Sequence, residues 1–442
     1  MQTTPEGALV VVYQPVSTLI SYPHNARTHS NHQIRQIARS ITEFGFTNPI
    51  LIDQNNTIIA GHGRLLAAQM VGMEQVPTIR LETLTQSQIR AYVLADNQLA
   101  LNAGWDKAIL AVEFEQLLAV NEEIDITATG FEIPEIDLIL QDAVNANDPE
   151  DEFPIEEAGP AATQPGDLWQ LGKHRVLCGN SLQESSYKTL MRGKRAAIII
   201  SDPPYNVPID GHVCGKGAVQ HREFQMASGE MSEAEFTRFL STTLRLFAKY
   251  SLSGSIHYLF IDWRHLRELL AAGGEAYGSL LNLCVWTKDN GGMGSFYRSQ
   301  HELILVFKNG KGAHRNNVQL GKFGRYRTNV WSYPGISTMS KQGEEGNLLA
   351  LHPTVKPVQM IADAILDASA RGEIVLDGFL GSGSTLLAAE RAGRICYGIE
   401  IDPLYVDVAI RRWQRYTGEQ ATLLSTGKTY DEVASTLEVI HG

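Results

Sequence analysis

The amino-acid sequence predicts an α/β protein in which a mostly parallel sheet carries helices on both faces and a smaller α+β region precedes it. At 442 residues the chain is too long for one ordinary domain, and its 43% hydrophobic and 19% charged residues are typical of a globular protein. From residue 166 to about 439, short apolar runs alternate with helical patterns. A glycine-rich turn at 378–383 joins one such run to a helical pattern, as in many ligand-binding α/β folds.

Apolar runs and helical spacing locate the individual elements. The candidate strands of the large region cover residues 196–200, 256–261, 281–286, 303–307, 374–376 and 395–399. In the smaller region, residues 9–118, an amphipathic stretch at 32–44 predicts a helix. Apolar runs at 49–52 and 57–60 predict strands, and the second passes through Gly-His-Gly-Arg at 61–64 into the start of a helix.

Charge is distributed unevenly along the chain. The formal net charge is -12, but residues 1–160 carry -15 and residues 161–442 carry +3. Fifteen acidic residues and no Lys or Arg occur at 113–157. We therefore expect an acidic connector and linker at 119–165, with its flexible part from residue 141 onward.

Composition and cysteine spacing argue against several classes of protein. The longest stretch without a charged residue, 7–26, contains polar residues and two prolines and is too polar for a bilayer helix. Residues 1–6 lack the basic region of a secretory signal, so we expect a cytoplasmic protein. The four cysteines form no Cys-x-x-Cys pair, which argues against a zinc module and a disulfide framework. His212, Cys214 and His221 make no convincing metal site.

The glycine turn predicts a nucleotide-like ligand. Gly378, Gly381 and Gly383 let the backbone approach a ligand, and the following helix begins with exposed N–H groups. Glu400 lies 23 residues after Asp377, about where an acid binds ribose hydroxyls in dinucleotide folds. The third glycine of a dinucleotide motif and the lysine of a phosphate-binding loop are both absent. S-adenosyl-L-methionine, which has no phosphate, is the remaining candidate, and a plain packing turn is the alternative.

A turn formed by Asp202, Pro203, Pro204 and Tyr205 follows the apolar run at 196–200. The prolines fix the backbone and leave carbonyls without competing donors, so the turn is a rigid array of acceptors. This geometry suits the exocyclic amine of a nucleobase, adenine or cytosine. Hydrogen bonds from that amine to the Asp202 carboxylate and the Pro203 carbonyl would turn the nitrogen lone pair toward a methyl donor. The Tyr205 ring would stack on the base, a contact of roughly 1–3 kcal/mol. An ordinary Pro-Pro turn ending a strand is the alternative interpretation.

Residues 166 to about 436 resemble the amino methyltransferases of DNA, in the permuted group where the catalytic turn precedes the cofactor loop. Six pieces match in family order: Asp-Pro-Pro-Tyr at 202–205, Trp-Thr-Lys at 286–288, Tyr-Arg-Ser-Gln-His-Glu at 297–302, His-Pro-Thr-Val-Lys-Pro at 352–357, Asp-Gly-Phe-Leu-Gly-Ser-Gly at 377–383 and Gly-Ile-Glu at 398–400. The resemblance implies a Rossmann-like methyltransferase domain over residues 166–442 and S-adenosyl-L-methionine as the cofactor.

The same resemblance implies a set of cofactor-binding residues. They are Asn180, Thr354, Lys356, Asp377, Phe379, Gly381, Gly383, Thr385 and Glu400, with Thr354 and Lys356 at the methionyl end. Asn180 stands after Cys-Gly where the family often has an acid, so it must act without charge. In that family an acidic first residue of the catalytic turn mostly accompanies adenine N6 transfer, and serine mostly accompanies cytosine N4 transfer. Asp202 therefore favours adenine.

A basic segment lies where this family recognises its DNA sequence, at about 308–351. Residues 308–341 contain seven bases and no acid. The candidate DNA contacts are Lys311, Arg315, Lys322, Arg325 and Arg327, some at phosphates and others at base edges. A solvated basic face is the alternative interpretation.

Residues 9 to about 118 resemble the N-terminal domain of ParB-type partition proteins, which is related in fold to sulfiredoxin. The matching pieces are Asn-Ala-Arg at 25–27, Phe-Thr-Asn-Pro-Ile at 46–50 and Gly-His-Gly-Arg at 61–64. The resemblance implies that Gly61, Gly63 and Arg64 bind nucleotide phosphates. The partition proteins have more arginines in this turn, so a role in substrate engagement or assembly fits as well as nucleotide hydrolysis.

The sequence thus predicts a site-specific DNA adenine N6 methyltransferase with a ParB-like domain at residues 1–118. Its cofactor would be S-adenosyl-L-methionine, its partner double-stranded DNA, and the family suggests a homodimer. The alternatives are cytosine N4 transfer, methylation of a protein glutamine, and a nucleotide-binding ParB-like DNA-binding or nuclease protein. The prediction depends on one spatial relationship: the proline turn and the glycine loop, distant in sequence, must lie side by side.

Overall fold

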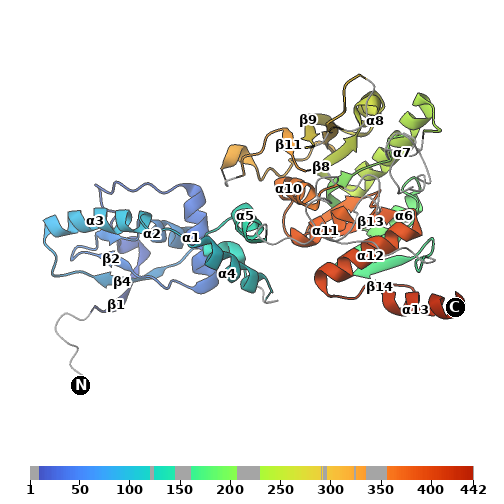
Figure 1. The fold of residues 1–442 in the computed structure, drawn as a ribbon. Coiled ribbons are helices and arrows are strands. Elements are labelled where there is room, and N and C mark those ends of the chain that lie inside the picture. Colours follow the sequence, from blue (N-terminus) through green and yellow to red (C-terminus); the bar gives the residue numbers. More distant parts are fainter. Residues whose placement is uncertain are drawn as a thin grey trace. The chain divides into compact units, whose positions relative to one another are not determined.

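The computed structural model describes residues 9–119, 124–144, 161–206, 229–289, 291, 296–322, 325–334 and 356–441. The chain divides into two compact units, Met1–Ala143 and Val144–Gly442, each with its own sheet and core (Figure 1). None of the helices in these ranges combines the length and the apolar character that crossing a bilayer requires.

The first unit is built on a four-stranded sheet with the strand order β1-β4-β2-β3. Its elements are β1 (Val11–Pro15), η1 (Val16–Thr18), α1 (Asn31–Phe44), β2 (Ile50–Ile52), β3 (Ile58–Ala60), α2 (His62–Met70), β4 (Gln75–Arg80), α3 (Gln86–Leu101), α4 (Lys107–Ala119), η2 (Ile126–Thr129) and α5 (Ile133–Val144). The helix expected at 32–44 and the strands expected at 49–52 and 57–60 are confirmed.

Local signals explain where the helices of this unit begin. The Ser30 hydroxyl caps α1 by accepting a hydrogen bond from the Gln33 N–H at 3.2 Å. Helix α2 begins after Gly61, whose φ of 105° is left-handed and suits glycine. The largest apolar cluster packed on this sheet consists of Leu19, Ile50, Ile52, Ile58, Leu65, Ala68 and Val76.

The segment expected to be an acidic connector is partly helical. Helix α5 and the turn η2 lie within 119–165, and Phe114 of α4 packs with Ile136 and Leu140 in a small buried cluster. The apolar positions of α5 recur at helical spacing, a signal that the acidic composition obscured. Residues 145–160 of the expected linker lie outside the described residues.

The second unit contains a ten-stranded sheet with the order β11-β9-β10-β8-β7-β12-β13-β6-β5-β14. Its strands are β5 (Leu168–Leu171), β6 (His174–Cys178), β7 (Ala196–Ser201), β8 (Ser251–Ile261), β9 (Ser279–Thr287), β10 (His301–Lys308), β11 (Val330–Ser332), β12 (Ile374–Asp377), β13 (Ile395–Glu400) and β14 (Thr422–Leu423). Its helices are α6 (Glu184–Met191), α7 (Glu233–Tyr250), η3 (Trp263–His265), α8 (Leu266–Ala276), η4 (Gln319–Gly321), α10 (Val358–Ala368), α11 (Ser384–Arg391), α12 (Pro403–Thr417) and α13 (Tyr430–His441). All six expected strands are present.

The sheet is mixed rather than mostly parallel. Strands β8, β7, β12, β13 and β6 run parallel to their neighbours in the middle, whereas β10 pairs antiparallel with β8 and β9, and β5 pairs antiparallel with β6 and β14. The connection between β5 and β6 is a tight turn at Gly172, which can join only antiparallel strands. The apolar runs indicated strands but carried no information about their direction.

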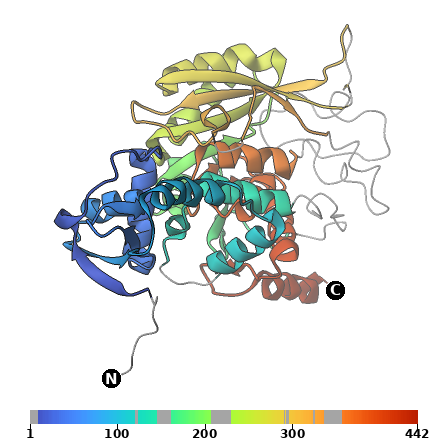
Figure 2. The ribbon, with the colours of Figure 1, turned by 90° about the vertical axis from the view of Figure 1, so that its left-hand side faces the viewer.

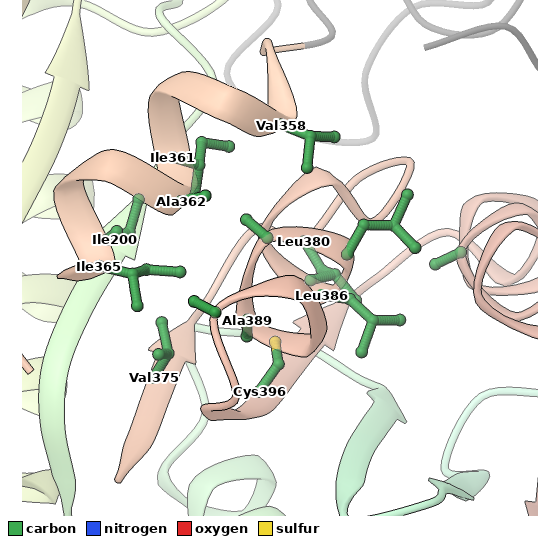
Figure 3. Close-up of a cluster of buried hydrophobic side chains, with 14 of the residues drawn as sticks. Ile200, Val358, Ile361, Ala362, Ile365, Val375, Leu380, Leu386, Ala389 and Cys396 are labelled. Carbon is green, nitrogen blue, oxygen red and sulfur yellow. The ribbon is translucent and has the colours of Figure 1, made fainter. Parts of the chain in front are cut away.

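Helices cover both faces of this sheet, as expected (Figures 1 and 2). Alternate residues of β7 face opposite cores: Ile198 and Ile200 pack with α10, α11 and α12, and Ile199 packs with α6, α7 and α8. Figure 3 shows Ile200, Val375 and Cys396 of three neighbouring strands beneath α10 and α11. Because the central strands are buried on both sides, their carboxyl ends have little freedom to move relative to one another.

Candidate active site

The Asp-Pro-Pro-Tyr turn (residues 202–205) and the glycine loop (residues 378–383) lie next to each other in the structure. Strands β7 and β12 pair in parallel, with Ile199 opposite Leu376, so the residues that follow them emerge at the same edge of the sheet. The Ser201 hydroxyl donates a hydrogen bond to Asp377 Oδ1 at 2.8 Å across 176 residues of sequence. The relationship on which the sequence prediction depends is therefore present.

Asp202 lies in a network of charged and hydroxyl groups. Its Oδ2 accepts a hydrogen bond from Lys356 Nζ at 2.5 Å, and its Oδ1 lies 2.5 Å from the Tyr205 hydroxyl. Glu302, near the start of β10, contributes Oε2 at 3.0 Å from the same hydroxyl and 3.1 Å from Lys356 Nζ. Lys288 closes the network with its Nζ 2.5 Å from Glu302 Oε1. Two lysines thus balance two carboxylates.

Burial and neighbouring charges shift the pKa values of Asp202 and Glu302 in opposite directions. Burial raises the pKa of Asp202 against the opposing charge of Lys356, and the nearby Glu302 carboxylate adds to the rise. Burial would also raise the pKa of Glu302, but the charges of Lys356 and Lys288 outweigh it and lower that pKa to about 2. A proton added to the network therefore favours Asp202 over Glu302. Such perturbed groups in contact are typical of functional sites.

The glycine loop is held by two buried carboxylates. Asp377 accepts hydrogen bonds from the Phe379 N–H at 3.0 Å and the Thr385 hydroxyl at 2.7 Å, and burial raises its pKa to about 6. Glu400, at the end of β13, accepts a hydrogen bond from the Gly381 N–H at 2.8 Å, and burial raises its pKa to about 7. Asp377 therefore shapes the loop from within, and Glu400 joins it to the next strand.

Gly383 permits the start of α11. Its φ is 88°, and a Cβ at this position would lie 2.8 Å from Ala409 Cβ.

The residues of the loop fit S-adenosyl-L-methionine. Glu400 is the carboxylate expected to bind ribose hydroxyls, and residues 378–385 include no Lys or Arg to hold phosphates. Asn180 follows β6 near this site, where its Oδ1 accepts a hydrogen bond from the Leu182 N–H at 2.8 Å.

The ammonium of Lys356, a residue expected at the methionyl end of the cofactor, binds Asp202 of the Asp-Pro-Pro-Tyr turn. It is 5% exposed and lies 5.5 Å from the centre of the Tyr205 ring, so its charge is directed at Asp202 and Glu302. Thr354, expected to act beside it, lies outside the described residues. Ser201, Glu302 and Lys288 had no role predicted from the sequence. The last two lie in pieces that match the methyltransferase family, which was the signal available for them.

Two of the five expected DNA contacts are internal ion pairs instead. Arg325 is 4% exposed and donates to Asp367 Oδ1 at 2.7 Å and to the Asp363 carbonyl at 3.0 Å. Arg327 Nε lies 3.0 Å from Asp367 Oδ2. These two arginines connect the basic segment to the carboxylates of α10. A guanidinium can be buried there because paired carboxylates balance its charge.

The remaining three expected contacts lie on the surface. Lys311 and Lys322 are exposed, and Arg315 pairs with Glu373 at 3.1 Å in an exposed ion pair. The His212, Cys214 and His221 set lies outside the described residues.

In the turn at 61–64 of the first unit, which was expected to bind nucleotide phosphates, the Arg64 side chain contacts neighbouring backbone carbonyls. Arg64 Nη1 donates to the carbonyls of Asn48 at 2.6 Å and Pro49 at 3.0 Å, and burial lowers the pKa of Arg64. A Cβ on Gly63 would lie 3.0 Å from His29 and Ile37, so this glycine permits close packing of α2 on α1. Arg64 therefore connects the start of α2 to the backbone that leads into β2.

Comparisons with known proteins agree with this geometry. Residues 196–411 match the DNA methylase family of N6 and N4 amino methylases. Residues 2–98 match the ParB N-terminal domain, and residues 108–165 match the ParB-methyltransferase HTH domain. The chain therefore contains an N6/N4 DNA methylase domain with a ParB domain on its N-terminal side, and the cofactor of such methylases is S-adenosyl-L-methionine. The HTH match covers all of the segment 119–165, which was expected to be a connector and linker.

Individual relatives cover different parts of the chain. The ParB-like nuclease domain-containing protein YnaK of Escherichia coli (strain K12) is 54% identical over 80 residues, which are 18% of this chain and 92% of that protein. Type II methyltransferase M2.DpnII of Streptococcus pneumoniae is 27% identical over 238 residues, which are 50% of this chain and 84% of that protein. The solved M1.HpyAVI-SAM complex is 19% identical, with a TM-score of 0.40 over 54% of this chain and 97% of that one.

Proposed function

We propose that this protein transfers a methyl group from S-adenosyl-L-methionine to the N6 amino group of adenine at specific sites in double-stranded DNA. The observation that carries the proposal is the contact between Ser201 and Asp377, which places the Asp202 turn beside the glycine loop. The acidic first residue of the turn supports adenine, since in the resembling methyltransferases an acid there mostly accompanies N6 transfer.

The catalytic turn would act mainly by positioning. The target adenine leaves the base stack at a cost of a few kcal/mol and enters beside the Tyr205 ring. The amine donates hydrogen bonds to the Asp202 carboxylate and the Pro203 carbonyl, which turns its lone pair toward the methyl group. Holding both reactants in line can supply roughly 7–11 kcal/mol of the barrier. The cofactor, when bound, supplies an activated methyl group on a sulfonium centre.

The cofactor would be held by the loop residues Asp377, Phe379, Gly381, Gly383 and Thr385 together with Glu400 and Asn180. We assign residues 166–442 to methyl transfer and residues 1–118 to an accessory role in substrate engagement or assembly. Strong nonspecific DNA binding by residues 1–118 is disfavoured, because they carry nine acids and seven bases, a net charge of -2, and so offer no excess of positive charge to phosphates. A homodimer acting in the cytoplasm is part of the same proposal, and sedimentation of the full chain tests its subunit number.

The test is to express the protein in cells that lack DNA methylation, digest their DNA to nucleosides and identify the modified base. We expect N6-methyladenine, and single-molecule sequencing of the same DNA should give one recurring site. The Asp202→Ala variant, expressed alongside, should give unmodified DNA. N4-methylcytosine would establish the cytosine alternative. No methyl incorporation, together with CTP or ATP binding that depends on Arg64, would favour the ParB-like nucleotide-binding alternative.

A further inference from the structure

One hydroxyl in the active site contacts two carboxylates. The Tyr205 oxygen lies 2.5 Å from Asp202 Oδ1 and 3.0 Å from Glu302 Oε2. A phenol carries a single proton and can donate only one full hydrogen bond. Both contacts are satisfied together when one carboxyl is protonated. If Asp202 carries that proton, it donates to the Tyr205 oxygen, and Tyr205 in turn donates to Glu302.

Two lysine ammonium groups bind the carboxylates on either side of this hydroxyl. Lys356 Nζ binds Asp202 at 2.5 Å and Glu302 at 3.1 Å, and it is 5% exposed. Lys288 binds the other oxygen of Glu302 at 2.5 Å and is 28% exposed. Glu302, held by both ammonium groups, therefore remains a carboxylate that can accept the Tyr205 hydroxyl.

Methyl transfer to an amine releases a proton that must be accepted. The amine lone pair forms the new carbon–nitrogen bond while the carbon–sulfur bond breaks and leaves its electron pair on sulfur. The nitrogen then has one proton too many and carries the positive charge. A carboxylate already hydrogen-bonded to that nitrogen is the nearest acceptor, and it can accept only while it is ionised.

We propose that Asp202, Tyr205 and Glu302 form a proton path in which Asp202 accepts this proton from the methylated amine while Tyr205 turns its hydroxyl proton from Asp202 to Glu302, and that Lys356 keeps Asp202 ionised before the transfer. The added proton then remains on Asp202, which donates it to the Tyr205 oxygen, and Glu302 stays a carboxylate that accepts the Tyr205 hydroxyl. This inference rests on the function proposed above. Asp202 contacts the reacting amine and is the catalytic residue. Glu302 and Lys356 act through Asp202 and Tyr205, so they are positioning residues for the same reaction.

The proposal makes opposite predictions for the two positioning residues. The groups facing Asp202 are Lys356 before α10, Glu302 of β10, Tyr205 of its own turn and Asp377 of β12 behind Ser201, with Lys288 beyond Glu302. Removing the Lys356 charge raises the pKa of Asp202, so the acidic limb of the rate profile moves to higher pH. Removing the Glu302 charge lowers that pKa, so the limb moves to lower pH.

The experiment measures the rate of labelled methyl incorporation into unmethylated genomic DNA as a function of pH, with the full chain at saturating DNA and cofactor. Lys356→Met should shift the acidic limb upward by roughly one to three pH units, and Glu302→Gln should shift it downward. Lys356→Arg should restore the wild-type profile. Tyr205→Phe keeps the stacking ring and should lower the rate on the order of 10²-fold, with unchanged cofactor binding by calorimetry.

The outcomes separate this inference from the proposed function. A wild-type protein that incorporates no methyl group would overturn the proposed function itself. An active wild type whose variants keep superimposable pH profiles, or shift in the same direction, would overturn the proton path alone. If Glu302→Gln fails to fold, as judged by its circular dichroism, Tyr205→Phe decides, because it removes a single oxygen. A fully active Tyr205→Phe variant would then exclude the path.

Discussion

The Ser201 hydroxyl donates a hydrogen bond to Asp377 Oδ1 at 2.8 Å and accepts one from the Gly378 N–H at 3.3 Å. It thereby joins the last residues of two neighbouring parallel strands, one leading into the catalytic turn and the other into the glycine loop. Adjacent strands in a sheet lie about 4.8 Å apart. The separation of the Asp-Pro-Pro-Tyr turn from the glycine loop is therefore set by strand pairing rather than by flexible loops.

Asp202→Ala should remove methyl transfer while leaving cofactor binding nearly intact. The carboxylate contacts the turn and Lys356 but not the glycine loop directly, so its loss should lower the rate on the order of 10²–10⁴-fold. The measurement combines labelled methyl incorporation with calorimetric titration of S-adenosyl-L-methionine. A parallel loss of rate and cofactor affinity would mean that Asp202 is structural.

Cofactor affinity should depend on pH through Glu400. We expect Glu400 to accept hydrogen bonds from the ribose hydroxyls of the cofactor. Because burial raises its pKa to about 7, it is a carboxylate above that pH and is protonated below it. Affinity should therefore fall as the pH drops through 7. Glu400→Gln should bind more weakly and show a flatter dependence in the same titrations. An equal slope in the variant would assign the pH dependence to another group.

Arg325→Ala should destabilise the methyltransferase unit. Its guanidinium is buried against Asp367, and removing one partner of a buried ion pair typically costs about 3–5 kcal/mol. Arg315→Ala is a matched control, since the Arg315–Glu373 pair is exposed and worth at most about 1 kcal/mol. Thermal unfolding of both variants makes the comparison. Equal melting temperatures would show that Arg325 is not a structural anchor.

Lys311→Ala should weaken DNA binding without changing stability. Lys311 is exposed in the basic segment, so it can contact a phosphate and release a counterion. The slope of log affinity against log salt should decrease by roughly one. Lys428→Ala, an exposed lysine near the other end of the sheet, serves as the control and should leave the slope unchanged. Identical slopes for the two variants would remove Lys311 from the DNA-binding surface.

Gly383→Ala should impair both stability and cofactor binding. The left-handed φ of 88° costs about 1–2 kcal/mol for an alanine, and its Cβ would also lie 2.8 Å from Ala409 Cβ. Gly372→Ala isolates the first effect, because its φ is 73° and no atom lies within 4 Å of the added Cβ. In chemical denaturation, Gly383→Ala should have a lower free energy of unfolding than Gly372→Ala, and only Gly383→Ala should lose cofactor affinity. The opposite order of unfolding free energies would show that α11 tolerates the added Cβ.

Some features of the site followed from local sequence alone. The apolar runs located the strands, and the Pro-Pro turn and the glycines located the loops at their ends, because these residues restrict the backbone wherever they occur. Helix α5 was not predicted, because the acidic composition of its segment concealed its apolar spacing. The basic segment was recognised, but its arginines could not be divided into surface and buried ones.

By itself the sequence determined the elements, the turn chemistry and the family motifs of this protein, since all of these depend on neighbours along the chain. The tertiary structure decided which charges meet. Lys356 reaches Asp202 across 154 residues, and Arg325 reaches Asp367 across 42. Electrostatic and hydrogen-bonding energies depend on distance and burial in space, which packing establishes only after the strands have paired.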